Sequence, residues 1–369
     1  MSISANRGEH SEMLAFLRIL HGGTVQVADK VGEPRQAWLK ISAVERPSDP
    51  GRRYLIRDHD VIVMDVSAKE ITTVTKADIK TIADGLYEQI KSAQGASFFC
   101  AASDEAFRVL KLVGAKATST FKSDLFLEVI SPVFQGEVLL LGFSVKSELG
   151  GLPTLLNAGA TQFQYRVTDC SAESVLEVQE AIPRREGKDY PGPMRLLPEL
   201  ARSQASVVFE SVVDSVFEQN LKMIDTAFPQ ILARTLRHAY LAGDLALKNA
   251  VKDPVLLDEL AEALSLPRPM VERLVRHKVK ELLRQSALGM NPGRQWDGQV
   301  EAHGGWIIVK ENGNIVCFHL INDDDFRDYL LNNTKFDTPS MSRHGAGYAY
   351  RQANSAEARL RLSLQIRFF

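Results

Sequence analysis

The two runs Ser123-Asp124-Leu125-Phe126-Leu127-Glu128-Val129-Ile130 and Glu137-Val138-Leu139-Leu140-Leu141-Gly142-Phe143-Ser144-Val145-Lys146 decide the fold of this chain. Both predict strands, and the second is apolar almost to its end, as a buried strand is. The segment 131–136, with one Pro and one Gly, predicts the turn of a hairpin between them. Antiparallel pairing would bring Asp124, which opens the first strand, and Lys146, which closes the second, to the same end of the sheet.

A carboxylate beside a lysine at the end of a buried sheet suggests a Mg²⁺ site for phosphodiester hydrolysis. The ion would polarise the phosphate and acidify a bound water, and the lysine would stabilise the developing charge. Nucleases of this kind usually carry Asp, a gap, Asp or Glu, any residue, and then Lys, but Ser144 stands at the second carboxylate position. Because Mg²⁺ usually takes one or two carboxylates, a further ligand is sought in Glu12 or Glu148. The alternative is that Asp124 is a turn residue and Lys146 a solvated edge charge.

Composition places the chain among ordinary globular proteins. It has 369 residues, 44 Lys and Arg, 46 Asp and Glu, and a formal net charge of −2, so any nucleic-acid binding must come from local patches. Cys100, Cys170 and Cys317 form no CxxC motif, which argues against disulfides and zinc. No run has the length of a membrane span and the N-terminus lacks a signal-peptide core, so we expect a cytoplasmic protein without membrane contact.

The first half predicts a mixed β-sheet flanked by helices. Residues 5–20 predict an amphipathic helix, 24–28 a strand and 38–65 a β-meander. A capping signal at Thr75 predicts a helix to about residue 93, and another helix is expected over 103–112. Glu12 lies in the first of these helices, where complementing the helix dipole is the alternative to metal binding.

The second half changes character twice. Residues 195–290 predict helices, including a basic segment at 266–285, and 305–320 predicts a hairpin around an Asn-Gly turn. Residues 359–368 predict one alternating strand with a basic outer face. Expected parts are therefore a nuclease core (1–190), a helical segment (195–290) and a C-terminal β-rich region for DNA recognition (291–369).

Several motifs, in the same order along the chain, resemble the HpaII family of type II restriction endonucleases. They are Asn6-Arg7-Gly8-Glu9-His10-Ser11-Glu12, Lys122-Ser123-Asp124-Leu125, Phe143-Ser144-Val145-Lys146-Ser147-Glu148-Leu149-Gly150, Pro153-Thr154-Leu155-Leu156-Asn157-Ala158, Gly304-Gly305-Trp306-Ile307-Ile308-Val309-Lys310, Asn332-Asn333-Thr334-Lys335-Phe336, Ser342-Arg343-His344-Gly345 and Leu364-Gln365-Ile366-Arg367-Phe368. With the strand pair, they predict an α+β or α/β fold with a PD-(D/E)xK-nuclease-like core.

The resemblance implies a Mg²⁺-dependent endonuclease that cuts double-stranded DNA at 5′-CCGG, with a cognate DNA methyltransferase that protects the host. It also implies that Ser144 before the lysine is a family trait. Asp124 would then be a metal ligand and Lys146 the charge-stabilising or water-orienting residue. Glu12 or Glu148 would complete the metal shell, and Glu12 ranks first because a helix beside the catalytic sheet suits such a ligand.

Base recognition is expected in the C-terminal part. A site of C·G pairs offers guanine O6 and N7, for which Arg or Lys is the natural donor. The candidate readers are Lys335, Arg343, His344 and Arg351, with second contacts from Asn157, Thr161 and Gln162. For each, a phosphate contact or a surface charge is the alternative. The palindromic site suggests a homodimer, although a monomer or transient assembly stays open.

Two other functions remain. One is a nuclease of the same core with another specificity, which the cutting pattern would distinguish. The other is a non-catalytic DNA-binding protein whose metal site has decayed, for which Ser144 is the sequence support; it would bind DNA without cutting it. A nucleotide-hydrolysing enzyme is not expected, since neither a P-loop nor a GxGxxG motif occurs.

Overall fold

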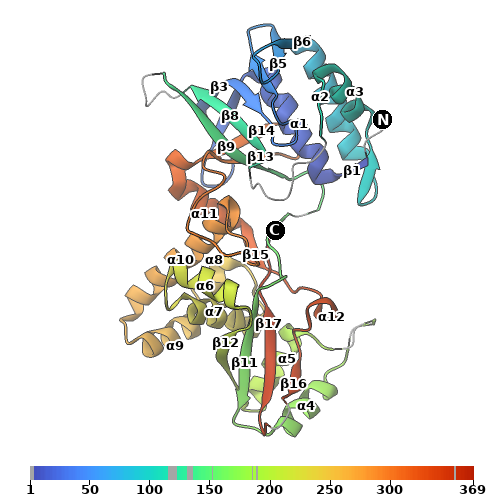
Figure 1. The fold of residues 1–369 in the computed structure, drawn as a ribbon. Helices are drawn as coiled ribbons and strands as arrows, with labels where there is room; N and C mark the ends of the chain where they lie inside the picture. Colours follow the sequence, from blue (N-terminus) through green and yellow to red (C-terminus); the bar gives the residue numbers. More distant parts are fainter. Residues whose placement is uncertain are drawn as a thin grey trace. The chain divides into compact units, whose positions relative to one another are not determined.

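The chain folds into two compact units, each built from two separate stretches. The computed structural model describes residues 4–114, 123–130, 136–151, 153–184, 186–187, 190–352 and 355–369. Unit 1 comprises Met1–Pro153 and Val300–Tyr329, and unit 2 comprises Thr154–Gln299 and Leu330–Phe369 (Figure 1). The sequence instead predicts three consecutive parts, 1–190, 195–290 and 291–369. The functions assigned to these parts stay predictions.

Unit 1 is organised around a mixed nine-stranded sheet of order β2-β14-β13-β9-β8-β3-β4-β5-β6. The strands are β2 (Thr24–Ala28), β3 (Pro34–Glu45), β4 (Arg53–Ile56), β5 (Asp60–Met64), β6 (Glu70–Thr75), β8 (Leu125–Ile130), β9 (Val138–Ser147), β13 (Gly305–Val309) and β14 (Ile315–His319). Strand β13 pairs parallel with β9, and β14 parallel with β2, whereas the β3-β4-β5-β6 meander and the β8-β9 pair are antiparallel. The mixed sheet, the meander and the strand pair are confirmed. Of the expected turn, residues 131–135 lie outside the described residues.

The helices of unit 1 cover the sheet with the apolar stripes that the sequence predicts. They are α1 (Arg7–Gly22), α2 (Lys76–Ser92), α3 (Ala101–Leu110) and α11 (Asp323–Asn333), whose residues to Tyr329 belong here, with the short η1 (Leu320–Asn322) and strands β1 (Ser4–Asn6) and β7 (Ser97–Phe99). Helix α1 begins at a capping box between Asn6 and Glu9. Met13, Phe16 and Leu17 on α1 are buried in the core beneath β9 and β13. This packing fixes where the polar side chains of α1 lie.

A tight turn closes the β13-β14 hairpin. Gly313 adopts a φ of +77°, and a Cβ there would lie 2.6 Å from the Tyr87 ring. Only glycine fits this left-handed position without strain. The Asn-Gly hairpin expected from the sequence is therefore confirmed.

Unit 2 contains a four-stranded sheet of order β12-β11-β17-β16 and a three-stranded sheet of order β10-β18-β15. The strands are β10 (Thr154–Leu156), β11 (Gln162–Thr168), β12 (Ser206–Val212), β15 (Thr334–Phe336), β16 (Ala349–Arg351), β17 (Ala358–Ser363) and β18 (Ile366–Phe368). The single strand expected over 359–368 is wrong, because Ser363 and Leu364 are both buried and the chain passes there from one sheet to the other. Strand β12 also interrupts the segment expected to be helical.

The helices of unit 2 are α4 (Ala172–Ala181), α5 (Pro193–Arg202), α6 (Ser215–Ile224), α7 (Phe228–Ala242), α8 (Leu247–Ala250), α9 (Pro254–Leu264), α10 (Arg268–Leu288) and α12 (Met341–His344). Of these, α4, α5, α6 and α7 pack against the four-stranded sheet, whereas α8 contacts β15 and α10 contacts β10 of the three-stranded sheet. The Tyr165 hydroxyl donates a 2.7 Å hydrogen bond to the Ala233 carbonyl of α7, and the ring of Phe163 lies 6.0 Å from that of Phe217 on α6. In the described part of the chain, no helix is long and apolar enough to cross a membrane.

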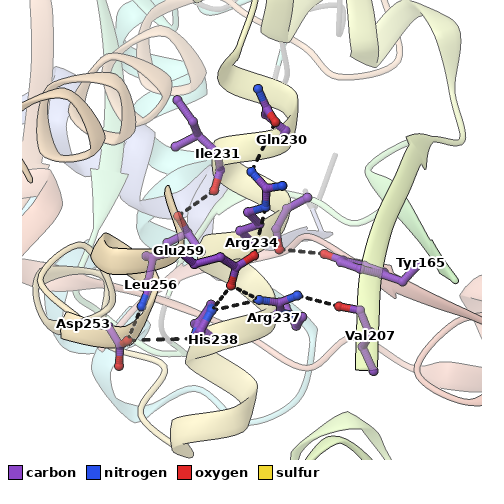
Figure 2. Close-up of polar contacts among 12 residues, drawn as sticks. Tyr165, Val207, Gln230, Ile231, Arg234, Arg237, His238, Asp253, Leu256 and Glu259 are labelled. Atoms are coloured by element: carbon purple, nitrogen blue, oxygen red, sulfur yellow. Dashed lines mark hydrogen bonds and ion pairs between the residues drawn. The ribbon is translucent and has the colours of Figure 1, made fainter. Parts of the chain in front are cut away.

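A charged cluster joins α7, α9 and β12 (Figure 2). Arg234 lies 3.0 Å from Glu259, His238 lies 2.7 Å from it, and Arg237 contacts both Glu259 and the Val207 carbonyl. Burial alone would raise the pKa of Glu259, but the hydrogen bond from His238 and the nearby positive charges outweigh it and lower that pKa. Glu259 is thus held as a carboxylate anion between the guanidinium groups of Arg234 and Arg237.

Candidate active site

Asp124 is fixed at the entrance to β8 by the neighbouring strand β9. Its backbone N–H donates to the Phe143 carbonyl at 2.8 Å. Its Oδ2 accepts from the Val145 N–H at 2.6 Å and from the Ser144 hydroxyl at 3.1 Å. Ser144 is buried. It therefore orients the carboxylate, and the other oxygen of Asp124 is not engaged in these bonds.

Glu12 comes from α1 and shares the electrostatic environment of Asp124. Burial and the negative charge of Asp124 together raise the pKa of Glu12 to about 8, against the opposing positive charges of Lys146 and Arg46. Arg46 is itself buried, 5.0 Å from the centre of the Phe16 ring and 2.6 Å from Asp49. The structure thus groups two carboxylates and one lysine at the junction of a helix and a strand pair.

Lys146 lies near the end of β9, beside the late strand β13. The parallel register places Lys146 opposite Ile308 and Ser144 opposite Trp306. The Lys146 Nζ lies 5.6 Å from the centre of the buried Trp306 ring, within the range of a cation–π interaction. This contact restricts where the lysine side chain lies.

Glu148 has a different partner. Its Oε1 accepts a 2.9 Å hydrogen bond from the Lys310 Nζ, and its backbone N–H donates to the Val309 carbonyl at 2.8 Å. The charge of Glu148 is therefore compensated by Lys310 on the β13 side. Glu12, in contrast, interacts electrostatically with Asp124 and Lys146.

The donor set of the site fits Mg²⁺. Glu12 and Asp124 offer carboxylate oxygens, and Mg²⁺ in proteins commonly takes one or two carboxylates and keeps several waters. Among the residues that the structure describes, no group of three or more His, Cys, Asp or Glu side chains forms a metal cluster.

The candidate DNA-binding residues all belong to unit 2, whereas Glu12, Asp124, Ser144, Lys146 and Glu148 all belong to unit 1. Their environments differ. Asn157, Arg343 and Arg351 are exposed, and Arg351 pairs with Glu173 at 3.0 Å.

The other candidates make contacts within unit 2. Lys335 lies over the Phe369 ring, and Gln162 donates a hydrogen bond to the His344 carbonyl. Thr161 is fully buried, and its hydroxyl donates to the Leu364 carbonyl at 2.5 Å. A direct base contact by Thr161 would require that bond to break.

Trp306 and Arg46 are the neighbours of the site that sequence reasoning missed. Trp306 stands in a motif that was noticed, but nothing in the sequence shows that β13 pairs with β9. Arg46 follows a strand and reads as an ordinary loop charge. Both positions depend on long-range packing.

Comparisons with known proteins agree over almost the whole chain. The family model described as HpaII restriction endonuclease matches residues 6–368. The type II restriction enzyme HpaII of Haemophilus parainfluenzae is 31% identical over 368 residues, which cover 99% of this chain and 98% of that protein. No solved structure matches significantly.

Proposed function

Because the chain belongs to the HpaII restriction endonuclease family and is a type II site-specific endonuclease, we propose that it hydrolyses phosphodiester bonds of double-stranded DNA at 5′-CCGG in a reaction that requires Mg²⁺. The observation that carries this proposal is the grouping of Glu12, Asp124 and Lys146. A nuclease needs a cation site beside a positive side chain at the scissile phosphate. The PD-(D/E)xK-like core belongs to the same proposal.

In this mechanism each side chain has one task. Glu12 and Asp124 would hold Mg²⁺, which when bound polarises the phosphate and acidifies a water. Ser144 keeps one oxygen of Asp124 in a fixed orientation. Lys146 presents a positive charge to the negative charge that develops in the transition state. Glu148 stays in its pair with Lys310 and supports the strand end.

The biological setting follows from the reaction. An endonuclease of this kind requires a cognate DNA methyltransferase that protects host sites, and both would work in the cytoplasm, where the DNA is. Since CCGG reads identically on both strands, a homodimer on the site is part of the proposal. Its size in solution is measurable by sedimentation with and without duplex.

The test is digestion of a plasmid of known sequence with Mg²⁺ or with EDTA, by the wild type and by Lys146→Ala. Lys80→Ala is a matched control, because Lys80 is an exposed α2 residue paired with Asp84. We expect fragments that map to every CCGG, abolished by EDTA, retained by Lys80→Ala and reduced by at least about 100-fold in Lys146→Ala, the scale of losing one charge-stabilising donor. Fragments at another sequence would reject the specificity alone. Intact but gel-shifted DNA would favour the non-catalytic binding protein.

A further inference from the structure

The four-stranded sheet of unit 2 has a polar face opposite the one that its helices cover. Gln164 and Arg166 of β11, Arg359 and Arg361 of β17, and Tyr350 of β16 alternate with the buried residues of these strands. The antiparallel register sets Gln164 opposite Arg361 and Arg166 opposite Arg359. We refer to these five residues as the polar sheet face. Side chains on such a face point away from the core, toward solvent or a ligand.

Two arginines of the polar sheet face have carboxylate partners. Arg359 lies 2.9 Å from Glu210 and 3.2 Å from Glu357. Arg166 lies 3.7 Å from the same Glu357. These pairs account for the positive charges of Arg166 and Arg359 within the protein.

Arg361 is different, because its neighbours orient it without neutralising it. Its Nε donates to the Gln164 Oε1 at 3.2 Å, and its guanidinium lies 5.4 Å from the centre of the Tyr350 ring. Among the described residues, no ion pair of the polar sheet face includes Arg361, and its contacts leave both terminal nitrogens of the guanidinium available. A hydrogen-bond acceptor on a ligand would stabilise this partly buried cation, because it would offset the free-energy cost of removing the charge from water.

The support beneath Arg361 is itself held in place. The Tyr350 hydroxyl also donates to the Gln164 Oε1, at 3.1 Å, while the Gln164 Nε2 donates to Glu210 at 3.0 Å. The amide of Gln164 therefore cannot turn without losing bonds at both ends. Such support fixes the direction of a guanidinium before a ligand arrives, which reduces the entropy lost on binding.

We propose that the polar sheet face contacts the DNA bases and that Arg361 reads a guanine of the recognition site. A guanidinium with two free parallel N–H groups matches the O6 and N7 acceptors of guanine in the major groove. Strands are known to enter grooves as readers. This inference rests on the proposed function, because guanine in a C·G-only site is the base that Arg361 would meet. It assigns base recognition to Arg361 of β17 with its aromatic support, in place of Lys335, Arg343, His344 and Arg351, the readers expected from the sequence.

The test measures binding separately from cleavage, with EDTA in the buffer. Fluorescence anisotropy would give the affinity of the wild type, Arg361→Gln and Arg361→Lys for a CCGG duplex and for a duplex with one pair of the site changed. Arg202→Gln serves as control, since Arg202 pairs with Glu199 on α5. Thermal unfolding would show that each variant is folded.

We expect both Arg361 variants to lose about 5- to 150-fold in the ratio of the two affinities, the range for one good bidentate base contact. Arg361→Lys would keep the wild-type salt dependence, because the charge remains. An unchanged ratio in both variants overturns the inference. So does an equal loss for both duplexes with a salt slope smaller by about 1, which is the behaviour of a phosphate contact. If the wild type itself shows no preference for the CCGG duplex, the proposed specificity fails. This outcome is distinguishable from failure of the inference alone, in which the wild type prefers CCGG and the Arg361 variants keep that preference.

Discussion

Glu12 is the residue whose protonation reports most directly on the site. Burial beside Asp124 raises its pKa to about 8, so the metal-free folded protein keeps a proton that the unfolded chain releases. A carboxyl group with a raised folded pKa makes the protein less stable as pH rises from its unfolded pKa toward that value. A bound cation would remove this cost by stabilising the anion.

We therefore expect Glu12→Gln to abolish cleavage and yet to stabilise the protein in EDTA at pH 8. The gain should be a rise of at least about 3 °C in Tm, the effect of roughly 1 kcal/mol in a unit of this size. At pH 5 the difference should nearly vanish, because Glu12 is then protonated in the folded state. Differential scanning calorimetry at both pH values measures this.

The control for Glu12→Gln is Glu88→Gln, which changes an exposed carboxylate on α2. It should leave cleavage and the pH dependence of Tm unchanged. If Glu12→Gln changed Tm equally at pH 5 and at pH 8, the raised pKa would not belong to Glu12.

At the same scale, the sequence indicates candidate residues by type and position, but not the contacts that they make. Asp124, Lys146 and Glu12 were selected from residue type and position, and the structure groups them. Glu12 ranks before Glu148 already at the level of the sequence; the ion pair of Glu148 with Lys310, which joins segments far apart along the chain, could not be predicted from it. Arg361 was visible only as one member of an alternating pattern, because its support by Gln164 and Tyr350 depends on the pairing of three strands.

Among the elements, the α7-α9 contact includes several ion pairs that share one side chain, Glu259. Glu259 holds Arg234, Arg237 and His238, and without it these groups face one another with no shared anion (Figure 2). Its side chain is 32% exposed, so the loss falls below that of a fully buried pair.

We expect Glu259→Ala to destabilise the protein by about 2 kcal/mol, whereas Glu262→Ala, at an exposed position of the same helix, has little effect. Because the pKa of Glu259 is lowered in the folded state, its stabilisation should disappear as pH falls below the ordinary carboxyl range. Urea unfolding at pH 7 and at pH 3.5 gives both quantities. Equal midpoints for the two variants at pH 7 would contradict the role of the cluster.

Elements with strong local patterns were predictable, and those chosen by tertiary partners were not. The apolar stripe of α2, with Ile79, Leu86 and Ile90, and the turn at Gly313 both give unambiguous local signals. The break between β17 and β18 does not, because the apolar alternation continues through Leu364 while the chain changes sheets. Local propensity cannot indicate which sheet a strand joins.

Across the whole molecule, the candidate catalytic and DNA-binding residues lie in different units. We expect Lys146→Ala to keep the wild-type ratio of affinities for CCGG and altered duplexes in EDTA while losing cleavage, because it leaves unit 2 unchanged. Anisotropy and plasmid digestion on the same preparation measure the two properties. Loss of discrimination in Lys146→Ala would show that recognition and catalysis do not separate in this way.

The completion of the nine-stranded sheet by β13 and β14 has a consequence during translation. Strand β9 is synthesised early, but β13, its parallel neighbour in the sheet, is synthesised only after all of Thr154–Gln299. Chains fold from the N-terminus as they emerge, and pairings between distant segments form late. A ribosome that stalls before residue 305 therefore releases a chain whose Lys146 lacks its Trp306 contact. Under the proposed function, a growing chain therefore becomes able to cut DNA only after β13 has been made.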